Sequence, residues 1–158
     1  MYQWLVLFHL VGVFSFLLAH GVSAFVIFRV PAEKDVTALR TLLNLSMRAQ
    51  IVATISLVVL LIFGVWAAFV GSQWSHGWPW AALGVLVVVW GAMSGEAGRT
   101  MRGLRAAVGF AGPNKPMGQP GTPEQIAAAQ VRVRPAISAT IGGVGLLALL
   151  WLMVLKPF

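Results

Sequence analysis

Three side chains of this sequence could bind a metal or a haem at one level of a membrane. His9 lies in the first apolar stretch, His76 lies in the connector between the second and third, and Met153 ends the fourth. An imidazole nitrogen can ligate haem iron or copper, and a thioether is a known second ligand for either. We therefore consider haem b at His9, or copper at all three residues. The alternatives are a hydrogen-bonded packing role for His9 and a solvated turn position for His76.

Two further ionisable residues, His20 and Glu96, lie deeper in apolar segments. His9 and His20 share one face of a helix but are separated by about 16 Å along its axis, so a single metal cannot bind both. His20 and Glu96 each follow a tryptophan by sixteen residues, which predicts a similar depth for the two. We expect either an intramembrane His20–Glu96 pair or an ion pair between Glu96 and Arg99, one helical turn on.

Long apolar stretches dominate the chain, which is 59% hydrophobic and 9% charged, with a mean hydropathy of +0.87. About 20 mostly apolar residues cross the roughly 30 Å hydrocarbon core of a bilayer. Four segments meet this criterion, at about residues 4–28, 49–71, 80–97 and 136–155. Backbone in hydrocarbon must satisfy its own hydrogen bonds, and these segments lack the alternation of barrel strands. The sequence therefore predicts an all-α fold, a four-helix transmembrane bundle that forms a single domain over residues 1–158.

The positive charges are distributed unevenly along the chain. Ten of the eleven Lys and Arg residues lie in the first and third connectors, and only Lys156 lies elsewhere. Such residues resist translocation, so this asymmetry predicts cytoplasmic connectors, periplasmic termini and a multi-pass location in a bacterial inner membrane. Topology and anionic lipid also explain the net charge of +7, and no nucleic-acid motif accompanies it. With no cysteine in the chain, disulfides and thiolate ligands are excluded.

Tryptophans provide a second indication of the membrane boundary, because their rings favour the interface. Six of the seven fall at or near the predicted periplasmic ends: Trp4, Trp66, Trp74, Trp78, Trp80 and Trp151. The first span lacks the basic start and cleavage site of a signal peptide, so we expect it to be retained.

The two basic connectors differ in their expected structure. The first connector could form an interfacial helix or extend the second span toward the cytoplasm; we favour the extension, because nothing between Thr37 and Ala49 breaks a helix. In the other connector, prolines and glycines over 109–123 predict irregular backbone. Thr122 should then cap a short helix, and Pro135 should interrupt it at the membrane entry.

Small residues at helical spacing indicate where helices approach closely in lipid. Gly91 and Gly95 form a GxxxG pattern on the third span, and Ser138 with Gly142 forms a similar pair on the fourth. We expect these residues to pack within the bundle, with docking to another subunit as the alternative.

The segment Leu5–Gly12 (LVLFHLVG), followed by Arg29, resembles the opening helix of small bacterial membrane proteins. These are the copper-resistance D-type proteins, a related uncharacterised family of four-helix integral membrane proteins, and the membrane haem-dependent protoporphyrinogen oxidases. The uncharacterised family fits best in length and span count, over about the first hundred residues. The resemblance implies that His9 is an axial haem ligand. No second ligand motif accompanies it, and the oxidase-like polar residues are limited to His20 and Glu96.

No nucleotide-binding, zinc-protease or nucleophile-elbow motif is present in the sequence. The leading hypothesis is therefore an inner-membrane protein without catalytic activity, an accessory or scaffolding subunit whose partners are membrane lipids and other membrane-protein subunits. The alternative is a b-type haem protein that uses His9 for electron transfer or oxidase-like chemistry, and a third hypothesis is copper handling.

Overall fold

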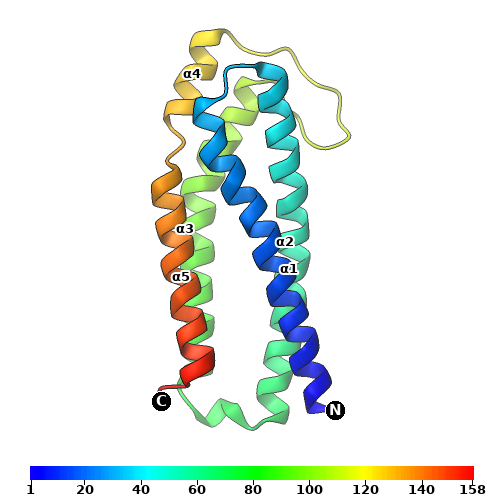
Figure 1. Ribbon diagram of the computed structural model, residues 1–158, viewed down its shortest axis with the longest axis vertical. Helices are drawn as coiled ribbons and strands as arrows, with labels where there is room; N and C mark the ends of the chain where they lie inside the picture. Colours follow the sequence, from blue (N-terminus) through cyan, green and yellow to red (C-terminus); the bar gives the residue numbers. More distant parts are fainter.

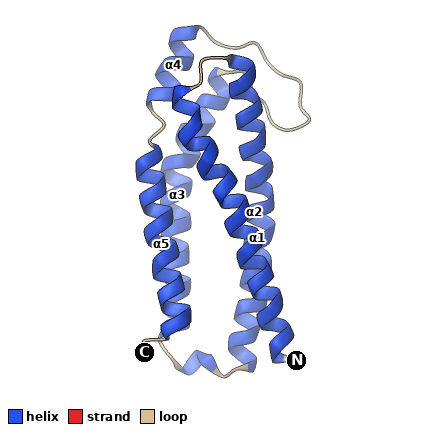
Figure 2. Ribbon diagram, viewed as in Figure 1, coloured by secondary structure: helices blue, strands red, loops and turns tan.

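The computed structural model describes residues 1–158 and contains helices but no strands (Figures 1 and 2). Four helices are long and apolar enough to cross a membrane, and a short helix, α4, precedes the last of them. The helices are α1 (Tyr2–Arg29), α2 (Val36–Val70), α3 (Trp78–Ala107), α4 (Pro123–Val131) and α5 (Pro135–Leu155), with 3₁₀ turns at Val30–Ala32 and Gln73–Ser75. The predicted all-α fold is confirmed, and it contains the predicted four helices that are long and apolar enough to cross a membrane.

Two helices run well past the apolar segments predicted from the sequence. The α2 helix begins at Val36 rather than at residue 49, because Asp35 caps it by accepting hydrogen bonds from the backbone N–H groups of Thr37 and Ala38 at 3.2 and 3.0 Å. This confirms the predicted extension of the second span. The α3 helix continues to Ala107 rather than ending at residue 97. Hydropathy indicates only how long the apolar part of each helix is. The helix itself continues until a capping residue or irregular backbone ends it.

The spanning helices form two pairs, α1 with α2 and α3 with α5, and the pairs contact each other little along the spans (Figure 1). Glycines bring the backbones of each pair together. A Cβ at Gly12 would lie 2.8 Å from the backbone nitrogen of Leu60, and one at Gly145 would overlap the side chain of Val89. These contacts are the close approaches that small residues permit in lipid.

Both chain termini lie at one end of the bundle, beside the α2–α3 turn, whereas α4 and the long loop before it lie at the other (Figure 1). We call these the terminal end and the basic end. The basic end is closed by a buried apolar cluster made of Val26, Ile27, Val30, Leu39, Leu43, Met101, Leu104, Val108, Phe110, Ile126 and Val133. The two helix pairs are therefore joined mainly at the basic end.

The loop between α3 and α4 is irregular but is held to α2. Arg40 donates hydrogen bonds from Nε to the carbonyl oxygen of Val108 at 2.8 Å and from Nη2 to that of Gly118 at 2.7 Å. Beyond the loop, Thr122 and Gln125 form the expected capping box at the start of α4. The α4 helix ends before Pro135, which begins α5, so the predicted interruption is confirmed.

Candidate functional site

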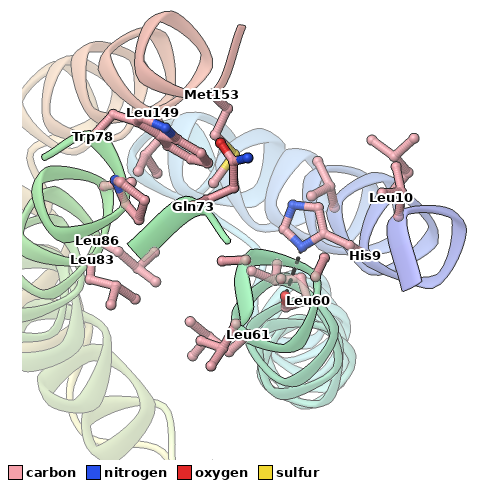
Figure 3. Close-up of a pocket in the computed structure, with 18 of the residues that line it drawn as sticks. His9, Leu10, Leu60, Leu61, Gln73, Trp78, Leu83, Leu86, Leu149 and Met153 are labelled. Carbon is pink, nitrogen blue, oxygen red and sulfur yellow. Dashed lines mark hydrogen bonds between the residues drawn. The ribbon is translucent and has the colours of Figure 1, made fainter. Parts of the chain in front are cut away.

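A cavity of about 500 Å³ lies at the terminal end, between the two helix pairs. Of the 27 residues that line it, 22 are hydrophobic. Figure 3 shows Leu60 and Leu61 on the α2 side, and Leu83, Leu86 and Leu149 across from them on α3 and α5. The splay of the pairs away from the basic end therefore leaves a partly open apolar space where lipid or another apolar molecule can be accommodated.

His9 is the one histidine whose side chain lines this cavity, and a hydrogen bond to α2 fixes the orientation of its ring. Its Nδ1 lies 2.8 Å from the carbonyl oxygen of Leu60. A carbonyl only accepts hydrogen bonds, so Nδ1 carries the proton in the neutral ring and Nε2 keeps a free lone pair. The ring fits because α2 has glycine opposite it: a Cβ at Gly64 would lie 2.7 Å from Nδ1. In Figure 3 the second ring nitrogen points away from Leu60, toward the cavity.

Of the other predicted ligands, Met153 shares this cavity and His76 does not. Met153 lies among the lining residues, on α5 (Figure 3). His76 is exposed in the α2–α3 turn, where its Nδ1 lies 3.4 Å from the hydroxyl of Ser75. The three residues expected to hold copper are therefore not brought together, because the turn carries His76 away from the space between the helices. The structure also contains no group of three or more His, Cys, Asp or Glu side chains placed to hold a metal ion.

The turn and the end of α5 add polar groups to the cavity wall that the sequence analysis did not single out as a site. Gln73, Trp74, Trp78 and Lys156 all line the cavity. The indole nitrogens of Trp74 and Trp78 are buried and have no hydrogen-bond partner. The Lys156 ammonium lies 5.4 Å from the centre of the Trp78 ring, within cation–π distance. The signal in the sequence was the tryptophan-rich turn, which we interpreted as an interface anchor and as a source of hydrogen-bond partners for His9; the partner is instead the Leu60 carbonyl on α2.

The expected pair of His20 and Glu96 is not formed. The His20 ring stacks on Phe16 at 5.7 Å, and its Nε2 would lie 3.2 Å from a Cβ at Gly142, so it faces α5 rather than Glu96 on α3. The Glu96 carboxylate makes no hydrogen bond or ion pair, including the alternative pair with Arg99; its backbone carbonyl accepts from Thr100 at 3.1 Å. Equal depth in the membrane did not bring the two side chains together, because α1 carries His20 against α5.

The small residues singled out from the sequence divide into two groups. Ser138 is buried and Gly142 receives His20, so the pair on α5 packs within the bundle. A Cβ at Gly91 would meet nothing within 4 Å, and one at Gly95 would meet only Arg99 of its own helix. The GxxxG face of α3 is therefore unpartnered within this chain, and close packing of α3 with α5 occurs at Gly145 instead.

Comparisons of the chain with protein-family models, with curated proteins and with solved structures find no match.

Proposed function

We propose that this protein is an integral membrane protein without catalytic activity that holds an apolar or amphiphilic ligand in the terminal-end cavity, as an accessory subunit of a larger membrane assembly. The cavity carries this proposal: its volume of about 500 Å³ and its mostly hydrophobic lining match ligand sites, which span about 300–1,000 Å³. An unfilled space of this size would forfeit dispersion contacts along four helices, so an apolar occupant stabilises the splayed arrangement.

Two further observations support the accessory role and the membrane location. The face of α3 that carries Gly91 and Gly95 is open, with Val87 and Val88 exposed beside it, and such a face suits docking to another membrane helix. The distribution of Lys and Arg favours a bacterial inner membrane with the basic end in the cytoplasm and both termini in the periplasm.

Filling the cavity should abolish ligand binding. We expect Leu86→Trp to remove at least about nine-tenths of the bound apolar ligand, because an indole would occupy space between the pairs. Leu147→Trp is the matched control, since Leu147 is 67% exposed on the outside of α5. Native mass spectrometry of detergent-purified protein, with dioctanoylglycerol as the probe, measures occupancy. Equal occupancy in the wild type and in Leu86→Trp would show that the cavity is not the binding site.

A second candidate, b-type haem binding, is favoured by the geometry of His9. Ligating histidines typically donate their other ring N–H to a backbone carbonyl, as Nδ1 of His9 does to Leu60, and the free Nε2 is then the donor atom. Met153 lines the same cavity and offers a thioether as a second donor. The residues present therefore fit a haem held by His9, and a bound haem would supply one-electron transfer.

The haem candidate predicts a Soret band in the absorption spectrum of the purified protein. His9→Ala should then lose the band, whereas His20→Ala should retain it, because His20 lies against α5 and is not part of the cavity wall. An undiminished band in His9→Ala would exclude this residue as the ligand, and a wild type reconstituted with haem that shows no band would exclude the candidate.

A further inference from the structure

The polar end of the cavity has the composition of a site for a negatively charged head group. Besides His9, the polar residues that line the cavity include Gln73, Trp74, Trp78 and Lys156, and none of the four Asp and Glu side chains is among them. Lys156 is also the one Lys or Arg side chain that lies away from the basic connectors. The polar part of the wall therefore contains one positive charge and no acidic side chain beside an apolar chamber.

The segment that follows α5 is fixed so that Lys156 stays at the cavity. The backbone N–H of Trp78 donates a 3.2 Å hydrogen bond to the carbonyl oxygen of Phe158. The Phe158 ring packs against Gly77, where a Cβ would lie 2.8 Å from ring atom Cδ2. Between these contacts and the helix, Lys156 adopts a left-handed backbone conformation with φ of 45°. This turn places the lysine beside the Trp78 ring rather than farther along the axis of α5.

Two indole N–H groups of the cavity wall lack hydrogen-bond partners. The Trp74 ring is held between Phe69 and Trp80, with ring centres 5.3 and 4.9 Å away, and its Nε1 is buried without an acceptor. Nε1 of Trp78 is in the same situation. Buried donors in folded proteins are almost always paired, so two neighbouring exceptions need an explanation. Solvent does not reach either nitrogen, so each ring must turn within the cavity wall before its N–H meets an acceptor.

We propose that the cavity binds a phospholipid with a net negative head group, whose acyl chains occupy the apolar chamber and whose phosphate is bound by Lys156 and the indole N–H groups of Trp74 and Trp78. This inference rests on the proposed ligand-holding function and names its ligand class. Phosphate oxygens are strong acceptors, and hydrogen bonds from a cationic donor to an anion are stronger than those between neutral groups. A ligand whose head group lacks acceptors would leave the indole donors unpaired, and among acceptors an anionic phosphate also pairs with the Lys156 ammonium.

The test compares three lipids with identical acyl chains on the full-length protein in detergent, by native mass spectrometry. The lipids are phosphatidylglycerol, phosphatidylcholine and diacylglycerol. We expect phosphatidylglycerol to bind at least about tenfold more tightly than diacylglycerol, as one charge-assisted contact implies, with phosphatidylcholine between them. The double variant Trp78→Phe with Lys156→Gln should reduce the ratio of the two affinities to less than about threefold.

The matched control is Trp66→Phe with Lys34→Gln, which removes the same groups from positions outside the cavity lining and should keep the full preference. Equal affinities of the wild type for phosphatidylglycerol and diacylglycerol would overturn the head-group site, but not the binding of an apolar ligand in the cavity. Failure of all three lipids to bind would overturn the proposed function as well. Inorganic phosphate that binds as tightly as phosphatidylglycerol would overturn the lipid assignment in favour of a free-phosphate site.

Discussion

Replacing Gly12 by leucine is expected to separate α1 from α2 and to destabilise the protein by at least about 2 kcal/mol, as overpacking does at closely packed positions. The expected effect is large because the neighbouring atoms are backbone: a Cβ at this position would lie 2.8 Å from the nitrogen and 3.0 Å from the Cα of Leu60. A flexible side chain could move aside, but the α2 backbone can yield only if the helices part. The thermal midpoint of the detergent-purified protein measures the effect.

Gly84 provides the matched control for this substitution, because a Cβ there meets nothing within 4 Å. Gly84→Leu should be neutral or slightly stabilising, since leucine has the higher helix propensity by several tenths of a kcal/mol. Gly12→Ala should give an intermediate loss. A Gly12→Leu protein that melts at the wild-type temperature would contradict the close packing of α1 on α2.

Cysteines placed one at a time at Ser75 and Gln119 should react oppositely with a membrane-impermeant thiol reagent. Ser75 lies in the α2–α3 turn at the terminal end, and Gln119 lies in the loop at the basic end. With the basic end in the cytoplasm, the cysteine at position 75 is labelled in intact spheroplasts and the one at position 119 only after lysis. The chain has no native cysteine, so background labelling is absent. Labelling of position 119 from outside would reverse the proposed orientation.

The four long apolar helices could be predicted from the sequence because an apolar segment of about 20 residues has few alternatives to a helix long enough to cross a membrane. The cap at Thr122 and the helix interruption at Pro135 could also be predicted, because each depends on only a few neighbouring residues. Helix pairing could not be predicted in the same way. The GxxxG pattern drew attention to Gly91, whereas the close approaches occur at Gly12 and Gly145. A small residue permits two helices to approach closely. Which face of a helix meets a neighbour depends on the packing of all the helices in the bundle.

The site was predictable only in part, for a similar physical reason. Depth in the membrane placed His9 and Met153 at one level, and the structure puts both on one cavity. Depth alone also suggested a contact between His20 and Glu96. The two side chains do not meet, because His20 points toward Gly142 on α5. The cavity itself arises from the splay of the two helix pairs, and the lysine beside it depends on a left-handed turn after α5. Neither feature has a sequence pattern of its own.

The most direct test of the central claim, that an amphiphile fills the space between the helix pairs, is an electron cryo-microscopy structure of the protein extracted in native-lipid nanodiscs. The proposed function predicts density for one bound amphiphile against Leu83, Leu86 and Leu149, with the two pairs splayed at the terminal end. A bound anionic phospholipid would add density for its head group beside Trp78 and Lys156. A bundle in which α1 and α2 close onto α3 and α5, leaving no cavity and no ligand density, would contradict the claim.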